Sequence, residues 1–415
     1  MADEHHSWHI GEEPPFIRPH SQAKHRVIAG YLSQYVATLS SNFQIPELRI
    51  TLVDGFAGGG RYRDKQTGEY CDGSPLLMLR AMQEAEAVGN IGRDRPFRLD
   101  AKYYFIESSR DTFPYLKATL ELSEFRDQLH DRIELINGKF IDNVDSIIRA
   151  IQHRKGGNRA IFVLDQFGYL DVPFSAIQSI LTRLKRAEII LTFAADSLID
   201  YLSEKDKTQK ILESLGLELS KDSIRTAKQE ADWRLAIQQR LHKEIFVRSG
   251  AKHYTPFFIR SKEAHRDYWL IHLSNHARAR DVMVGLHWKE HAGFAHYGKP
   301  GLAMLGYDQD RDTKLSGQEF LFDNSAQTLT HEHLLDQLPE RVSLFSDGVE
   351  FKSLFAHVTN ETPATSSIIA NALNVLRSNG EVEIHDKFGK KTRRIKHSSD
   401  VIRPARQKLF FGPDA

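Results

Sequence analysis

A chain of 415 residues with 40% hydrophobic content is long enough to form two or three domains and to bury a sizeable core. The formal net charge of +1 excludes a chain that is basic throughout, so any nucleic-acid surface must come from local clustering. One cysteine excludes an internal disulfide framework and a cysteine-rich zinc site. No apolar run approaches the roughly 18 residues of a membrane span, and we expect a soluble cytoplasmic protein without a membrane partner.

The N-terminal region combines a polar arm with a first helix. The histidines of residues 1–20 have no carboxylate partner at a fixed spacing, so we interpret this segment as a loose arm rather than a metal site. Across 21–40, apolar residues recur at the i, i+3, i+4 spacing of an amphipathic helix. Lys24 lies in its first turns and is a candidate cofactor contact, although its spacing also fits a solvated residue.

The first strong motif is a strand that runs into a glycine-rich turn. The apolar run 50–53 ends in Asp54, and four of the next six residues are glycine. Such a turn lets the backbone approach a bound cofactor closely, and Asp54 places a carboxylate where open α/β sheets bind ligands. The pattern outlines a nucleotide or S-adenosylmethionine (SAM) site, and a purely structural turn is the alternative.

Three further segments supply candidate cofactor contacts. Ser74 and Pro75 have the order of an N-cap and a first-turn proline, and they open a helix. Glu107 ends a second apolar run, where doubly wound folds place an acid on the cofactor's ribose; an ordinary surface acid is the alternative. Asp142 follows a third predicted strand and either meets the adenine amine or caps the next helix.

The fourth strand gives the least ambiguous signal. The apolar run 160–164 ends in Asp165, Gln166, Phe167 and Gly168 at the carboxyl edge of the predicted sheet. Methylation of an amine needs an acceptor that keeps the nitrogen lone pair aimed at the methyl donor, and an aromatic face that holds a flat base. Asp165 and Phe167 could supply these. The alternative is a helix N-cap followed by a core phenylalanine.

The alternation of strands and helices predicts a parallel sheet with right-handed crossovers. A charged segment near 197–250 with scattered leucines predicts a helical insertion that covers the cleft. His276, Arg278 and Arg280 follow a late predicted strand; they would face the ligand edge if that strand joins the sheet, or else lie in a solvated loop. The glycine-rich stretch 292–305 is either a flexible flap or an ordinary connection.

From residue 325 to 415 the pattern predicts a winged-helix domain. Three amphipathic helices precede two predicted strands, 381–384 and 393–396, which flank a turn as the strands of a wing do. Residues 377–408 contain ten Lys or Arg against four Asp or Glu, which favours contact with phosphates; protein docking is the alternative. The candidate nucleic-acid contacts are Lys387, Lys390, Lys391, Arg393 and Arg394.

Five segments in chain order resemble a known family: LVDGFAGGGRY, GSPLLML, YYFIESS, GKFID and VLDQFGYLDVP. They are similar to the three-Cys-motif partner (TcmP) proteins and, more distantly, to the RlmJ-type ribosomal-RNA adenine-N6 methyltransferases, chiefly over residues 24–195. The resemblance implies an α/β fold: a Rossmann-like SAM-dependent methyltransferase sheet within 21–320, a helical insertion and a C-terminal winged-helix domain. By position, the cofactor pocket would be lined by Asp54, Phe56, Gly58 and Gly60, with Ala57 as a further candidate, and flanked by Ser74 and Pro75. Glu107 would take the ribose, Asp142 would approach adenine, and Asp165, Gln166, Phe167 and Gly168 would form the catalytic turn.

One departure from the family pattern bears on function. Members carry Asp-Pro-Phe-Gly or Asp-Pro-Pro-Tyr, whereas Gln166 stands in the position of the first proline and does not fix φ. One hypothesis is a SAM-dependent methyltransferase that acts on adenine N6 or another exposed base amine of RNA or DNA. The other is a non-catalytic adaptor that partners another enzyme, and the resemblance suggests a partner of the three-Cys-motif type. A nuclease is disfavoured and no metal site is expected, because the carboxylates show no compact metal-ligand spacing.

Overall fold

The computed structural model describes residues 8–203, 205–230, 233–261, 266–290, 294–297, 319–321 and 324–405. The chain divides into two compact units, Met1–Ala295 and His296–Ala415, and each is described by itself. The first seven residues of the arm, most of the stretch 292–305 and the basic residues beyond Ala405 lie outside the described residues. Within the described ranges no helix is both long and apolar enough to cross a membrane.

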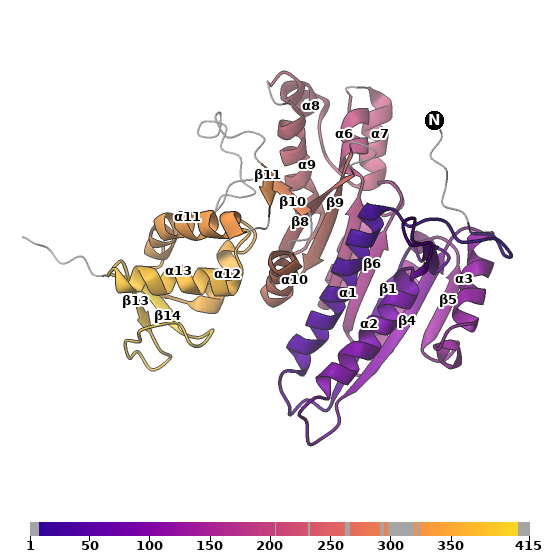
Figure 1. The fold of residues 1–415 in the computed structure, drawn as a ribbon. Helices are drawn as coiled ribbons and strands as arrows, with labels where there is room; N and C mark the ends of the chain where they lie inside the picture. Colours follow the sequence, from indigo (N-terminus) through magenta and orange to yellow (C-terminus); the bar gives the residue numbers. More distant parts are fainter. Residues whose placement is uncertain are drawn as a thin grey trace, which may run out of the picture. The chain divides into compact units, whose positions relative to one another are not determined.

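A mostly parallel sheet forms the centre of the first unit (Figure 1). Its parallel strands are β1 (Glu47–Asp54), β4 (Arg98–Glu107), β5 (Ile133–Asn137), β6 (Arg159–Asp165) and β7 (Arg186–Phe193). They lie in the spatial order β5-β4-β1-β6-β7, so the chain moves outward from β1 in one direction and then from β6 in the other. This is the doubly wound order, and its topological switch point lies between β1 and β6.

Antiparallel strands extend the sheet beyond β7. Strand β9 (Arg266–Ser274) pairs with β7, β8 (His253–Ser261) with β9, and β10 (Phe294–Tyr297) with β8. Because β9 is antiparallel, it ends beside the start of β7, with Ser274 opposite Glu188. The three residues His276, Arg278 and Arg280 therefore follow the strand at the amino edge of the parallel strands. The expectation that they face the ligand edge is wrong.

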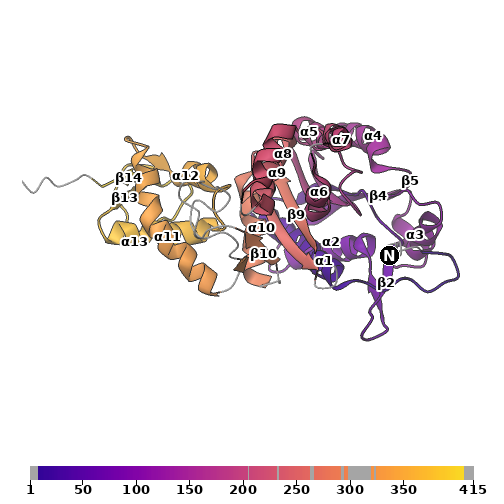
Figure 2. The same ribbon diagram turned by 90° about the horizontal axis from the view of Figure 1, so that it is seen from above.

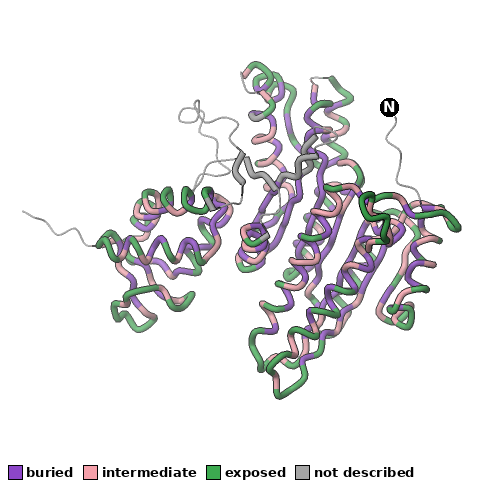
Figure 3. Tube along the Cα trace, viewed as in Figure 1, coloured by how far each residue is buried: buried purple, intermediate pink, exposed green. Residues whose placement is uncertain are grey.

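Helices cover both faces of the sheet (Figure 2). One face carries α1 (Pro19–Ser40), α2 (Ser74–Gly89) and α10 (Ala277–Glu290), and the other carries α4 (Phe140–His153), α5 (Phe174–Arg183) and α9 (Trp233–Ser249). Helix α3 (Thr112–Glu121) connects β4 to β5. The central strands are consequently buried along nearly their whole length (Figure 3). This two-sided burial explains why their sequences are continuous apolar runs rather than alternating ones.

A buried polar cluster fixes α1 to the sheet. The Tyr31 hydroxyl donates a hydrogen bond to Oε2 of Glu188 in β7, and Nε2 of His272 in β9 lies 3.2 Å from the same oxygen. All three side chains are buried. A buried carboxylate is costly unless it is hydrogen-bonded, so these contacts hold the helix at one position on β7 and β9.

Two further segments complete the first unit. The charged region after β7 forms α6 (Ala195–Tyr201), α7 (Asp206–Leu215), α8 (Lys221–Lys228) and α9, so it is helical. None of its described residues lines the cavity at the carboxyl edge of the sheet. The polar insertion after the glycine turn forms an antiparallel hairpin of β2 (Arg61–Arg63) and β3 (Tyr70–Asp72).

The second unit contains three helices and a small antiparallel sheet. The helices are α11 (Asn324–Ser343), α12 (Phe351–Val358) and α13 (Ser366–Ser378), and a short strand, β11 (Glu319–Leu321), precedes them. Strands β12 (Val349–Glu350), β13 (Val382–His385) and β14 (Val401–Pro404) lie in the order β12-β14-β13. The Thr365 side chain accepts a hydrogen bond from the Ile368 N–H at 3.3 Å and so caps α13.

The second strand of the wing lies later in the chain than expected. The sequence placed it at 393–396, but β14 occupies Val401–Pro404, with Ile402 opposite Ile384 of β13. Ile402 is fully buried, whereas Ile395 is the one apolar residue of the expected segment and is partly exposed. A strand that packs on helices needs an inward apolar side chain, so the burial of Ile402 explains why the strand forms at Val401–Pro404 and not at 393–396.

Candidate functional site

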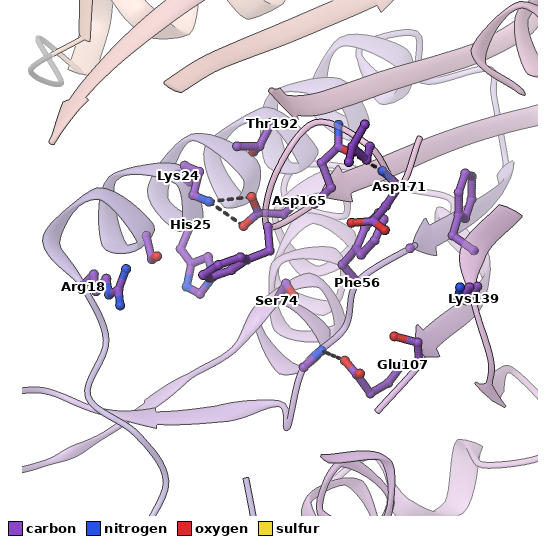
Figure 4. A pocket seen from close by; sticks show the side chains of 18 of the residues that line it. Arg18, Lys24, His25, Phe56, Ser74, Glu107, Lys139, Asp165, Asp171 and Thr192 are labelled. Carbon is purple, nitrogen blue, oxygen red and sulfur yellow. Dashed lines mark hydrogen bonds and ion pairs between the residues drawn. The ribbon is translucent and has the colours of Figure 1, made fainter. Parts of the chain in front are cut away.

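A cavity of about 550 Å³ opens at the carboxyl ends of β1, β4 and β6 (Figure 4). Register brings three acids to this place, because Asp54 lies opposite Phe105 of β4 and Val163 of β6. Phe105 lies two residues before Glu107, and Val163 lies two residues before Asp165. Ligands of doubly wound sheets bind at this crevice. The lining residues include Trp8, Arg18, Lys24, His25, Phe56, Gly58, Ser74, Glu107, Lys139, Asp165, Gln166 and Phe167.

The glycine turn after β1 is hydrogen-bonded to both neighbouring strands. The Gly55 N–H donates to the Val163 carbonyl and the Ala57 N–H to the Ile106 carbonyl, each at 2.9 Å. A Cβ on Gly55 would lie 2.8 Å from a leucine of β6, and Gly58 has a φ of +60°. Both positions therefore favour glycine. The bare backbone of this turn forms one wall of the cavity.

Asp54 is fully buried at the base of that turn. Its Oδ1 accepts a hydrogen bond from the Phe56 N–H at 3.1 Å, whereas Oδ2 has no hydrogen-bond partner among the described residues. Burial raises the pKa of Asp54 to about 7, although hydrogen bonding from Ser74 and from the Phe56 N–H acts in the opposite direction. Near neutral pH this carboxyl is balanced between its two forms, and a nearby cation would favour the carboxylate.

Glu107 is held at the end of β4 by backbone donors. Its Oε2 accepts from the Gly58 N–H at 2.9 Å, as Figure 4 shows, and its Oε1 accepts from the Ser109 N–H at 2.7 Å. Burial raises the pKa of Glu107, and these N–H groups act against that rise. With backbone donors at Ser109, Gly58 and Ser108, the carboxylate still has an acceptor position for a ligand hydroxyl. Glu107 is partly buried and lines the cavity, so it is not an ordinary surface acid.

Lys24 forms a bidentate ion pair with Asp165 across the cavity wall (Figure 4). Its Nζ lies 2.5 Å from Oδ1 and 2.6 Å from Oδ2, and Lys24 is buried, so the expectation of a solvated residue is wrong. Burial disfavours ionised Asp165, but the Lys24 ammonium and a Thr192 hydrogen bond hold the pKa of Asp165 below its usual value. Burial lowers the pKa of His25 to about 4, although the Asp165 charge acts to raise it. The imidazole is therefore neutral near pH 7, and Lys24 is the cation that faces Asp165.

Gln166 stiffens the turn after β6 through its side chain. Its Oε1 accepts hydrogen bonds from the N–H groups of Asp171 at 3.1 Å and Val172 at 3.2 Å. The side chain is buried, and Nε2 has no acceptor within the described ranges. These two bonds close the turn, a function that proline performs by fixing φ. Phe167 follows at 55% exposure and lines the cavity, so it is not a core phenylalanine.

The N-terminal arm supplies a wall that sequence reasoning missed. Trp8 is 5% exposed, and its Nε1 donates to the Arg61 carbonyl at 2.7 Å. A Cβ on Gly59 would overlap with the indole ring and lie 2.7 Å from Nε1. Further along the arm, the Ile17 N–H donates to the Arg63 carbonyl at 2.8 Å. The arm is therefore held in place at Trp8 and at Ile17. The apolar Trp8 and Ile17, both buried, are the signal in the arm that could have revealed this.

Six predicted site residues are not among the cavity's lining residues in the described part of the chain. Asp142 is exposed in the first turn of α4, whose N-cap is Lys139, so Asp142 does not cap the helix. Pro75 lies in the first turn of α2, where Gly73 rather than Ser74 is the N-cap. The remaining four are Asp54, Ala57, Gly60 and Gly168.

The basic residues of the second unit lie together on the loop between β13 and β14. Lys387, Lys390, Lys391, Arg393 and Arg394 are all exposed. Lys391 pairs with Glu383 of β13, with 2.6 Å between Nζ and Oε1. Across the described ranges, no three His, Cys, Asp or Glu side chains are grouped so as to hold a metal ion.

The family model of the GMT-like wHTH domain, a winged helix-turn-helix, matches residues 306–389. This match agrees with the three helices and the small sheet of the second unit. The second unit is a winged-helix domain. No curated protein sequence matches the chain.

Several solved structures are similar to the chain at low sequence identity. One is protein LPL1258 from Legionella pneumophila str. Philadelphia 1, of family model DUF519, at 10% identity over 62% of this chain and 85% of that chain, with a TM-score of 0.33. Another is a SAM-dependent methyltransferase from Agrobacterium tumefaciens, at 9% identity over 62% of this chain and 63% of that chain, with a TM-score of 0.31. A third is the METTL16 MTase domain, at 12% identity over 59% of this chain and 66% of that chain, with a TM-score of 0.25. At such scores these likenesses support no argument about activity, which rests on the site itself.

The first unit has a Rossmann-like, doubly wound sheet. Its five parallel strands follow the doubly wound order, and antiparallel β9 and β8 complete the edge beyond β7. The glycine turn, the acid of β1 and the acid of β4 lie at its switch point, where such sheets bind a nucleotide-like cofactor.

Proposed function

We propose that the chain is a SAM-dependent methyltransferase that acts on an exposed base amine of RNA or DNA, with adenine N6 favoured. Its winged helix would position the substrate. The observation that carries the proposal is the convergence of Glu107 and Asp165 on one cavity at the switch point of the sheet, with Asp54 buried at the base of the glycine turn that forms part of its wall. A glycine turn and an acid from each of three adjacent strands meet there.

The residues around the cavity fit SAM. When bound, SAM would supply a methyl group from a positively charged sulfonium. Asp54 presents a buried oxygen that lacks a partner among the described residues, and an added positive charge favours its carboxylate form. Gly55 and Gly58 add no side chain of their own to the wall, and Glu107 offers an acceptor for a ribose hydroxyl.

Asp165 would orient the amine. The Lys24 ammonium keeps Asp165 ionised, so the carboxylate can accept a hydrogen bond from the amine N–H and direct the nitrogen lone pair. With hydrogen bonds from Lys24 and Thr192, the carboxylate still has an acceptor position for the amine. Phe167, more than half exposed on the same turn, offers a flat surface for a base. Because an aromatic amine is nearly neutral, alignment contributes more than a strong base would.

The wider resemblance supplies further hypotheses. We propose membership of the three-Cys-motif partner family, a partner protein of the three-Cys-motif type, and a cytoplasmic location. The alternative function is a non-catalytic adaptor with a SAM site. The adaptor is suggested by Gln166, which stands where the family carries proline. Because its two hydrogen bonds close the turn without proline, they favour the methyltransferase over the adaptor.

Two measurements on three variants test the proposal. Calorimetry with SAM reports cofactor binding, and transfer of a tritiated methyl group to total RNA and DNA reports activity. We expect Asp54→Ala to abolish SAM binding, and Asp165→Ala to retain binding but lose transfer. Asp142→Ala is the matched control, since this acid is exposed and lies on α4 rather than at the end of β1, β4 or β6, and it should change neither quantity. Equal SAM affinity in the wild type and Asp54→Ala would contradict the cofactor site, and SAM binding without any transfer would favour the adaptor.

A further inference from the structure

The wing of the second unit ends in an exposed aromatic ring. Phe388 is 83% exposed and lies on the loop between β13 and β14. The ring does not contribute to the core of the winged helix. The exposed ring is therefore accessible to a partner.

Hydrogen bonds hold the backbone of this tip in one conformation. Asp386 Oδ1 accepts from the N–H groups of Phe388 and Lys390, each at 2.9 Å. The Asp386 N–H donates to the Lys390 carbonyl, and the Gly389 N–H donates to the Asp386 carbonyl, again at 2.9 Å. Gly389 has a φ of +82°, which favours glycine. The turn is thus formed before any partner binds, with Phe388 near its apex.

The base of the tip is anchored to β13. The two ring nitrogens of His385 lie 3.0 Å from the Gly389 carbonyl oxygen and 2.9 Å from Glu383 Oε2. The Thr392 N–H donates to the Ile384 carbonyl at 2.8 Å. A preformed, anchored tip loses little conformational entropy when it binds a partner.

Positive charge surrounds the ring. Between Lys387 and Ser399 the sequence contains six Lys or Arg and no Asp or Glu. Nζ of Lys387 lies 4.9 Å from the centroid of the Phe388 ring. Lysine is depleted from the apolar centre of protein interfaces, whereas a polyanion matches this charge. Nucleic acid is the partner class that offers phosphates beside flat apolar surfaces.

We propose that Phe388 stacks on an unpaired or unstacked base of the nucleic-acid substrate, while the neighbouring lysines contact its phosphates. This inference rests on the proposed nucleic-acid function of the winged helix and adds how that domain contacts a strand. Stacking on an aromatic side chain tolerates any base, so the contact gives affinity and strand position rather than sequence preference.

The test uses the full chain and a single-stranded RNA of mixed sequence that contains 2-aminopurine, with a DNA of the same sequence beside it. We expect Phe388→Ala to weaken binding about tenfold and to reduce the change in 2-aminopurine fluorescence on binding, with the salt slope unchanged. Phe388→Trp should retain both. Leu344→Ala is the matched control, because Leu344 is a 65% exposed apolar residue elsewhere in the second unit, and it should have no effect.

A charge variant separates failure of this inference from failure of the proposed function. With Lys390, Lys391, Arg393 and Arg394 all replaced by Ala, binding should weaken and its salt slope should flatten. If that variant weakens binding and Phe388→Ala does not, the stacking contact is overturned and the nucleic-acid function stands. If the wild type binds neither probe, or the charge variant binds as the wild type does, the winged helix is a protein-docking module and both proposals fail.

Discussion

Gly59 should be intolerant of a side chain because of one distant residue, Trp8. The indole lies directly on the glycine turn, so a Cβ at position 59 would overlap with it. The φ of Gly59 is not in the left-handed range that restricts Gly58 and Gly60. Alanine is therefore compatible with the backbone itself, and the cost of Gly59→Ala should come from the displacement of Trp8.

The size of that cost follows from the burial of Trp8, which is 5% exposed. A tryptophan buries about 200 Å², and at about 25 cal/mol per Å² its release costs at most about 5 kcal/mol. The hydrogen bond from Nε1 to the Arg61 carbonyl adds about 1 kcal/mol when it is lost. Because a freed arm regains contacts with water and conformational freedom, we expect Gly59→Ala to lower the free energy of unfolding by about 3 kcal/mol.

Urea unfolding of a double-mutant cycle tests this reasoning. In a Trp8→Ala background the overlap no longer exists, so Gly59→Ala should be neutral, or stabilising by up to about 1 kcal/mol, because alanine reduces the entropy of the unfolded chain. The sign of the effect should thus change with the background. An equal destabilisation in both backgrounds would refute the assignment of Trp8 as the residue that position 59 contacts.

Other changes in the site have equally definite outcomes. Lys24→Met removes the charge that holds the pKa of Asp165 down, so this pKa should rise and the acid limb of the pH–rate profile for methyl transfer should move to higher pH; Lys24→Arg should keep most of the original position. The ion pair stabilises the fold above the unfolded pKa of the aspartate and stabilises it less as pH falls. Lys24→Met should therefore lower the free energy of unfolding by about 3 kcal/mol at pH 7. A loss that is equally large at pH 3 would contradict this sign. Gln166→Ala removes the acceptor for two backbone N–H groups, so those of Asp171 and Val172 should exchange hydrogen faster while SAM affinity is kept; unchanged exchange would mean that the side chain does not close the turn.

The sequence predicts the parallel sheet and its acids because that information is local. A strand buried on both faces is a continuous apolar run, and Asp54, Glu107 and Asp165 each mark the end of one. Since parallel strands end at one edge, three local patterns suffice to indicate that these acids lie near one another. Helical periodicity is also a local pattern, and it predicted the three helices of the winged-helix domain.

What the sequence did not predict depends on contacts between distant segments. The direction of β9 is set by its pairing with β7, and an apolar run carries no sign of direction, so the residues after it were placed at the wrong edge. Trp8 and Lys24 acquire their roles from partners 53 and 141 positions away, and local spacing contains no trace of either. The second wing strand was predicted at 393–396 because the strand's true position depends on the burial of Ile402, which a local pattern does not show.

The cluster of Tyr31, Glu188 and His272 has a consequence for how damage spreads through the first unit. Tyr31 stands two helical turns after Lys24, about 10 Å along the same rigid rod. Loss of the contacts that hold α1 at the amino edge of the sheet would let the Lys24 ammonium move away from Asp165 at the opposite edge. Variants far from the cavity could therefore lose turnover while every cavity residue is intact, and a screen for inactive clones should recover Glu188.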